Sequence, residues 1–260
     1  MEENIKQLDL RNLIKLNVNF IEFFGYFCPE YEKSVQKICY YVYASIFVGF
    51  IYISYILSEI ANMIVVFGDM EKMTEASFLL LTHIVHSFKL YVFITRKSQV
   101  RNLINSINRE EFKPRNVEQY KILLEDIETS RMITKTFLFM GFATCALWGI
   151  FPFLDQNDDD SIRLPLSGWF PFNTNKQAVF EFVYVYQTVG ALINGLANIS
   201  MDTFLSGTIM VISGQLSILN NSLQIMKQRF GEKPDKIETV KAEVTQSLIR
   251  NVIHYRNIIQ

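Results

Sequence analysis

The sequence has few of the residues that build metal, catalytic or nucleic-acid sites. Only three cysteines occur in 260 residues (Cys28, Cys39 and Cys145), far apart and with no CxxC motif or histidine–cysteine cluster. Neither a zinc site nor a disulfide framework is therefore indicated. The formal net charge of −1 argues against a nucleic-acid binder. Because nucleophile-elbow, P-loop and dinucleotide motifs are missing too, the sequence supports neither an enzyme nor a cofactor.

A cleaved signal peptide is also not indicated. Glu2, Glu3 and Asp9 stand where a basic region should lie, and no small-residue cleavage site follows a compact apolar core. Any insertion into a membrane should therefore come from the later apolar segments.

Half of the residues are apolar, and they collect in four long runs at about 38–66, 76–94, 133–153 and 178–226. A helix needs roughly 20 apolar residues to cross a bilayer core, which each run approaches or exceeds. The fourth would form a helix of roughly 70 Å, more than twice the core thickness, so its second half must leave the bilayer or bend. The pattern predicts an all-α, polytopic membrane protein.

The remaining segments predict helices outside the bilayer. Residues 5–27 suit an amphipathic or partly inserted helix that ends at Cys28-Pro29, and residues 98–130 suit two amphipathic helices separated at Pro114. The expected organisation has an N-terminal part, a four-span part with a cytosolic loop and an outer loop, and a basic tail with the start of a further helix. The N-terminal part covers residues 1–34, and the four-span part covers 35–226, with its cytosolic loop at 96–131 and its outer loop at 154–177. The basic tail covers 227–260.

Loop charges predict the orientation. The loop after the first span has one basic residue, Lys72, and the loop after the third span has two, Arg163 and Lys176. Residues 95–132 and the tail after the fourth span are rich in lysine and arginine. Basic loops stay on the cytosolic side, so the N-terminus is expected in the cytosol of a multi-pass plasma-membrane protein.

Four stretches resemble the insect odorant receptors. The loop LPLSGWFPF (164–172) followed by FEFVYVYQTVG (180–190) is similar to that family's second outer loop and its entry into the fourth helix. The segments at 201–226 and 248–259 are similar to the cytosolic half of that helix and the approach to the fifth. The resemblance implies a seven-helix cation channel opened by volatile odorants, in a heterotetramer with a co-receptor. Because helices five to seven are not in this sequence, which would be a fragment, we expect no channel activity from these residues alone.

The resemblance also implies an odorant pocket in the outer half of the bundle. Its candidate lining comes from the second, third and fourth spans: Leu80, Leu81, Ile84, Gly141, Thr144, Cys145, Trp148, Tyr186, Val189, Gly190 and Ile193. Such a pocket would be dry and aromatic, which suits a small apolar ligand. At each position, helix packing or contact with lipid is an equally good interpretation.

Three polar features have simpler explanations than a functional site. Asp202 in the fourth run is expected to be a structural partner of a neighbouring helix near the inner membrane face. His83 and His86 share a helical face, but no carboxylate joins them at helical spacing, so packing is favoured over a metal. Residues 158–160 form an acidic run without the spaced ligands of a calcium loop.

Three alternatives stay open. A gustatory-type receptor would share this topology, although the loop at 164–172 favours the odorant branch. The co-receptor itself is disfavoured, because the segment after the fourth span lacks its long insertion. A small-molecule transporter would need paired charges or broken helices at mid-membrane, and the spans are expected to offer only Asp202.

Overall fold

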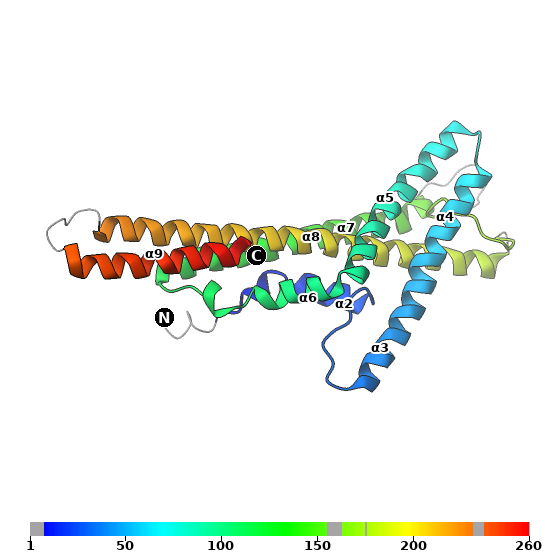
Figure 1. The fold of residues 1–260 in the computed structure, drawn as a ribbon. Coiled ribbons are helices and arrows are strands. Elements are labelled where there is room, and N and C mark those ends of the chain that lie inside the picture. The colour runs from blue at the N-terminus through cyan, green and yellow to red at the C-terminus, as the bar shows by residue number, and fades with distance from the viewer. Residues whose placement is uncertain (1–7, 155–162, 175, 231–236, 260) are drawn as a thin grey trace. The chain divides into compact units, whose positions relative to one another are not determined.

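The computed structural model describes residues 8–154, 163–174, 176–230 and 237–259, and every regular element in these ranges is a helix (Figure 1). The elements are η1 (Leu10–Leu13), α2 (Lys15–Phe23), α3 (Ser34–Phe47), the π-helix η2 (Val48–Ile53), α4 (Ser54–Val65), α5 (Met70–Thr95), α6 (Lys97–Ser106), η3 (Glu110–Phe112), α7 (Val117–Leu154), α8 (Gln177–Phe230) and α9 (Ile237–Ile259). The prediction of an all-α protein is confirmed.

Four helices in the described ranges are long and apolar enough to cross a membrane: Ser34–Val65, Met70–Thr95, Val117–Leu154 and Gln177–Gln228. They match the four predicted runs. Their apolar side chains are widely exposed, for example Ile46 at 66%, Phe78 at 68% and Phe139 at 72%. Large exposed apolar surfaces need a covering, and a lipid bilayer provides one.

Two predicted boundaries were wrong. The second amphipathic segment after Pro114 is not a separate helix, because it continues without a break into the third span as the 38-residue α7. The N-terminal helix ends at Phe23, before Cys28-Pro29. Gly25, with φ of 79°, ends it: the Gly25 N–H donates to the carbonyl of Glu22, and the Tyr26 N–H donates to the carbonyl of Ile21. Glycine adopts this left-handed conformation without steric cost.

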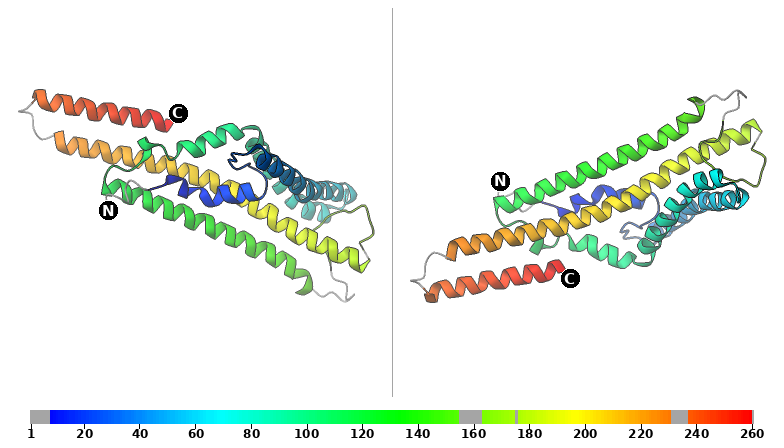
Figure 2. Two further views of the ribbon diagram at one scale, coloured as in Figure 1. Left: turned by 90° about the horizontal axis from the view of Figure 1, so that it is seen from below. Right: turned by 90° about the horizontal axis from the view of Figure 1, so that it is seen from above.

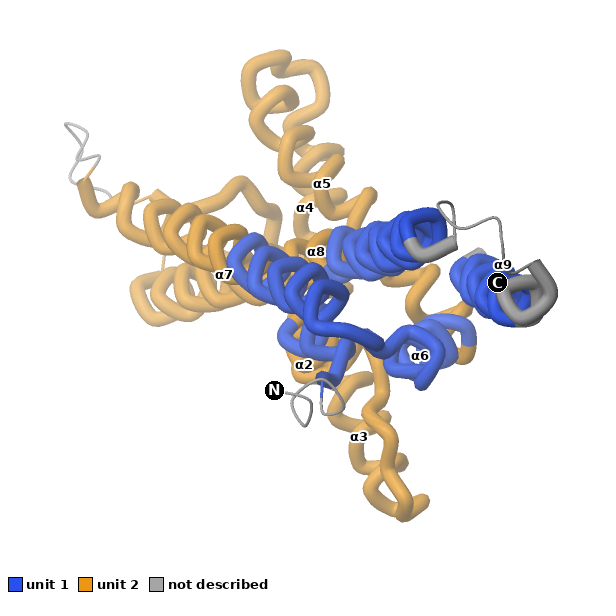
Figure 3. The backbone as a smooth tube through the Cα atoms, turned by 90° about the vertical axis from the view of Figure 1, so that its left-hand side faces the viewer, with its two compact units in different colours: residues 1–16, 99–133, 204–260 blue, residues 17–98, 134–203 orange. Residues whose placement is uncertain are grey.

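The chain divides into two compact units, coloured separately in Figure 3. Unit 1 comprises residues 1–16, 99–133 and 204–260, and unit 2 comprises residues 17–98 and 134–203. Helices α7 and α8 each contribute one half to each unit. The sequence-based division at residues 34 and 226 stays a prediction.

In unit 1, the second half of α8 is flanked by α9, by the first half of α7 and by the N-terminal segment (Figure 2). The Ser130 hydroxyl donates to the carbonyl of Leu13 at 2.9 Å, and the Gln215 amide donates to the carbonyl of Phe112 at 3.1 Å. Gly207 permits the close approach, because a Cβ there would lie 2.9 Å from Ile14 Cγ2. Buried hydrogen bonds and a small residue therefore hold these segments together.

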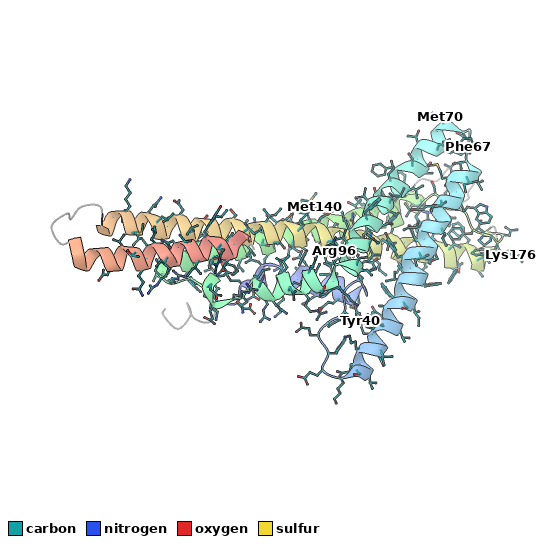
Figure 4. All side chains as sticks on the ribbon, in the orientation of Figure 1. Tyr40, Phe67, Met70, Arg96, Met140 and Lys176 are labelled. Carbon is teal, nitrogen blue, oxygen red and sulfur yellow. The ribbon has the colours of Figure 1, made fainter. Side chains whose placement is uncertain are left out.

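In unit 2, α4 and α5 form a hairpin whose tip carries Phe67 and Met70, exposed at 81% and 75% (Figure 4). The buried Asn17 amide joins α2 to two other helices. It donates to Thr203 Oγ1 at 2.5 Å and lies 3.4 Å from both Thr134 Oγ1 and the Ser200 carbonyl oxygen. Unit 2 contains all of the predicted odorant-pocket residues.

Candidate functional site

Within unit 2, the first half of α8 contacts α4 on one of its faces. A Cβ on Gly190 would lie 2.8 Å from two ring carbons of Tyr55, so glycine allows this ring to approach the α8 backbone closely. One turn earlier, the Tyr186 hydroxyl lies 2.6 Å from Ser54 Oγ. Two of the predicted pocket residues, Tyr186 and Gly190, therefore lie together against α4.

Another face of α8 packs on α7 through small residues. The Cys145 thiol lies 3.7 Å from the carbonyl oxygen of Ala191, and a Cβ on Gly195 would lie 3.4 Å from its sulfur. Gly141 faces Ile199 so closely that a Cβ would overlap its side chain. Small residues allow helices in a membrane to approach closely and gain van der Waals contact. Gly141 and Cys145 thus take part in helix packing.

The other predicted pocket residues vary in exposure. Leu81, Ile84, Thr144 and Val189 are exposed, and Leu80, Trp148 and Ile193 are half-buried. Their shared role in one odorant pocket stays a prediction. Tyr186 lines a cavity of about 360 Å³ together with side chains from η2, α4 and the outer loop.

A buried glutamate–histidine pair joins α4 to α5. Glu59 Oε2 lies 2.8 Å from His83 Nδ1, and the two side chains are 5% and 8% exposed. The Tyr55 ring stands edge-on to the His83 imidazole, 5.5 Å between centroids. No carboxylate joins His83 at helical spacing along α5, as the sequence indicated; Glu59 reaches it from the preceding helix.

His86 lies beside this pair in an aromatic environment. It is fully buried, and the rings of Tyr26 and Tyr52 stand edge-on to it at 5.7 and 5.0 Å. Within the described ranges, no group of three or more His, Cys, Asp or Glu side chains could hold a metal ion. His86 packs against the Tyr26 and Tyr52 rings, and the choice of packing over a metal stays a prediction.

A second polar pair joins α5 to α8. Lys89 Nζ lies 2.7 Å from Asp202 Oδ1 and donates to Asn198 Oδ1 at 2.8 Å. The expected structural role of Asp202 agrees with this ion pair to a neighbouring helix. The spans hold more polar pairs than Asp202 alone suggested, since Glu59 contacts His83 and Lys89 pairs with Asp202, and the π-helix η2 interrupts the first span. The expectation that none of these features lies at mid-membrane stays a prediction.

Sequence inspection overlooked Glu59, although one signal was present. An ionisable residue inside an apolar run is costly unless it has a partner. Glu59 stands in such a run, so a search of the neighbouring spans for a basic or histidine partner would have led to His83. Only the packing of α4 on α5 determines which of the histidines it meets.

The fold and the polar pairs describe a helical membrane protein of at least four spans, in which buried side chains connect neighbouring helices. Comparison with known proteins gives the family. Residues 69–260 match the family model for the 7tm odorant receptors, which is most of the chain. The chain belongs to the insect odorant receptor family.

Individual relatives agree with this assignment. Odorant receptor Or1 of Anopheles gambiae is 24% identical over 60% of this chain and 37% of its own length. Odorant receptor 46a, isoform A, of Drosophila melanogaster is 24% identical over 79% of this chain and 50% of its own length. This chain therefore spans half or less of the length of these curated relatives.

Solved structures show the same fold. The insect olfactory receptor OR5 of Machilis hrabei superposes with a TM-score of 0.72 at 13% identity, over 96% of this chain and 64% of that one. Its complex with eugenol superposes with a TM-score of 0.69 at 14% identity, over the same shares of both chains. The four membrane helices found here thus correspond to part of that receptor fold.

Proposed function

We propose that this chain supplies the odorant-binding part of an odorant-gated cation-channel subunit. The family match over residues 69–260 is the observation that carries this proposal. Together with a co-receptor subunit, the complete receptor would detect small, volatile, apolar molecules. The role is that of a receptor and not of an enzyme.

The proposed odorant site lies in the outer halves of α5, α7 and α8. Trp148 is its central residue, since it is half-buried and offers a large aromatic surface, with the exposed Thr144 one turn away. A solved relative is known in complex with eugenol, a small aromatic molecule, which supports a ligand of similar size here. Burying about 250 Å² of such a ligand would gain on the order of 6 kcal/mol before the cost of lost freedom.

The proposed location is the plasma membrane, with the N-terminus in the cytosol. The basic residues between α5 and α7 support this orientation through the positive-inside rule. An epitope placed before Met1 should bind its antibody on intact cells only after permeabilisation. Labelling of unpermeabilised cells would contradict the orientation.

A transporter is the main alternative, because the membrane helices do contain paired charges. Each pair connects two neighbouring helices, however: Glu59 meets His83 and Lys89 meets Asp202. Pairs of this kind serve helix packing as well as they serve transport. The match to the odorant receptor family favours the receptor, and it also favours the odorant branch over the gustatory one.

The experiment that tests the function records currents from cells that express the co-receptor and the receptor containing these residues, with any sequence that follows Gln260. Trp148→Ala should change the ranking of effective odorants while surface expression stays the same. Leu147→Ala is the matched control, since Leu147 is 64% exposed on the same helix. An unchanged odorant profile for Trp148→Ala would refute the proposed site. The absence of any odorant-evoked current from the unmutated receptor would refute the proposed function.

A further inference from the structure

A cavity of about 360 Å³ lies in unit 2 between η2 and α4, the outer loop at 163–174, and the beginning of α8. Aromatic side chains form most of its wall, and none of the lining residues is charged. The lining is Phe50, Ser54, Leu57, Ser58, Ala61, Trp169, Phe170, Pro171, Phe172, Phe182 and Tyr186. Tyr186 is the one predicted odorant-pocket residue in this lining, and the α7 residues around Trp148 are not part of it.

The rings in this wall are arranged around Tyr186. Phe50 and Phe170 stand edge-on to the Tyr186 ring at 5.7 and 6.3 Å, and Phe182 is stacked on it at 6.4 Å. Trp169 and Phe172, in the outer loop, remain 43% and 47% exposed. Edge-on and stacked contacts of this kind favour a flat aromatic guest, which could add further ring contacts of the same geometry.

The loop that covers the cavity is held by specific hydrogen bonds. The Ser58 hydroxyl donates to the carbonyl of Trp169 at 2.9 Å, and the Trp169 N–H donates to the carbonyl of Ser58 at 3.2 Å. The Gln187 amide donates to the carbonyl of Leu166 at 2.9 Å. The aromatic wall is therefore a built part of the fold.

The π-helix η2 determines the polar group that faces this wall. The Ser54 backbone N–H donates to the carbonyl of Gly49, five residues back, and the Ser54 hydroxyl donates to the carbonyl of Phe50. Ser54 Oγ lies 2.6 Å from the Tyr186 hydroxyl, which also lies 3.5 Å from the carbonyl oxygen of Phe50, so the Tyr186 proton has acceptors within the protein. The Tyr186 oxygen can then still accept a hydrogen bond, so a ligand in the cavity should carry a hydrogen-bond donor.

We propose that this cavity is a second ligand site, which binds a neutral aromatic molecule carrying one hydrogen-bond donor, such as a phenol, an aromatic alcohol or an indole. The uncharged lining excludes ionic guests, because an unpaired charge would be costly to bury there. The volume is within the range of small-molecule sites, about 300–1,000 Å³. The guest reaches the cavity from the membrane, in which such molecules dissolve.

Trp169 allows a direct binding experiment. The chain has only two tryptophans, so Trp148→Phe leaves Trp169, in the wall of the cavity, as the single tryptophan, which is excited selectively at about 295 nm. The probe is 2-naphthol, which absorbs tryptophan emission, and 2-methoxynaphthalene is its partner without a donor. Each probe is titrated into the chain reconstituted in lipid nanodiscs while the Trp169 fluorescence is measured. Nanodiscs that contain tryptophan octyl ester in place of the protein serve as the lipid control, because they show how much quenching comes from probe dissolved in the lipid.

The expected result is saturable quenching by 2-naphthol beyond that in the lipid control. Tyr186→Phe should weaken 2-naphthol binding about fivefold, the equivalent of one hydrogen bond, and leave 2-methoxynaphthalene unchanged. Ala61→Phe should abolish saturation by filling the cavity. Val85→Phe, at an exposed α5 position outside the lining, should bind like the parent.

Two results would overturn the proposal. Quenching that rises linearly and equals the lipid control means that no site exists. Equal binding of both probes, unchanged by Tyr186→Phe, means an apolar slot that lipid chains can fill. If Ala61→Phe loses its helical circular dichroism, the comparison of the two probes on Tyr186→Phe decides alone, since that variant removes only one oxygen atom.

Discussion

The buried pair of Glu59 and His83 should be the most sensitive polar contact between α4 and α5. His83→Leu removes the imidazole, whose Nδ1 lies 2.8 Å from Glu59 Oε2, and leaves a 5%-exposed carboxylate without that partner. Leaving a buried charge without its partner costs about 3–5 kcal/mol, and losing a neutral hydrogen bond between membrane helices costs about 0.6 kcal/mol, so the measured loss distinguishes a charged pair from a neutral one. Because Glu59 Oε1 has no hydrogen-bond partner among the described residues, the variant leaves the buried side chain without its contact to His83, and we expect a loss of about 3 kcal/mol.

The assay heats the chain in detergent to a series of temperatures and measures the fraction that remains folded by size-exclusion chromatography. In a chain of this size, 1 kcal/mol shifts the midpoint by roughly 2–4 °C, so His83→Leu should lower it by about 6–12 °C. Thr82→Leu, at the exposed neighbouring position, is the matched control and should leave the midpoint unchanged.

The double variant Glu59→Leu/His83→Leu distinguishes a lost pair from a lost packing contact. Replacing a buried ion pair by apolar side chains of similar size is often neutral or stabilising, and Glu59 Oε1 has no hydrogen-bond partner that would be lost. The double variant should therefore recover most of the stability. A double variant as unstable as His83→Leu would refute the reasoning, because the cost would then come from the imidazole's packing against Tyr55 and not from the stranded carboxylate.

Three further outcomes follow from single positions. Gly190→Ala should cost about 1–3 kcal/mol of stability, seen as a lower unfolding midpoint in the same assay, since its Cβ would lie 2.8 Å from the Tyr55 ring. An unchanged midpoint would show that the ring moves aside freely. Asn17→Leu should cost about 1–3 kcal/mol by removing the hydrogen bonds that the buried amide donates to Thr134 and Thr203, and Asn17→Asp, which keeps an acceptor but loses the donor, should not rescue it. Burial, together with a nearby arginine, lowers the pKa of His254 below its usual 6.5, so the unfolded chain binds this proton more tightly than the folded one. Stability should thus decrease as the pH falls below about 6.5, and His254→Phe should remove that part of the pH dependence in midpoints measured between pH 5 and pH 8.

The sequence alone predicted the class of protein, because the periodicity and length of apolar runs are local properties. The uncharged run from Ile38 to Leu57 is sufficient for a membrane helix, and the family resemblance of the loop at 164–172 was confirmed by the match to the 7tm odorant receptors. Helix ends were less predictable. The sequence placed the end of the N-terminal helix at Pro29, although a glycine four residues earlier provides the left-handed turn that ends it.

Only the tertiary structure decided which side chains meet. Glu59 lies on α4 and His83 on α5, the two helices of the hairpin. No periodicity in either helix predicts their contact, since it depends on how α4 is rotated about its axis against α5. The same is true of Tyr186, which the sequence grouped with Gly141 and Cys145, but which the packing places on the α4 face of α8 beside the π-helix. The sequence therefore determined which segments are helical and apolar, while the rotation of each helix about its axis determined which residues can share a site, because that rotation depends on all the neighbouring side chains at once.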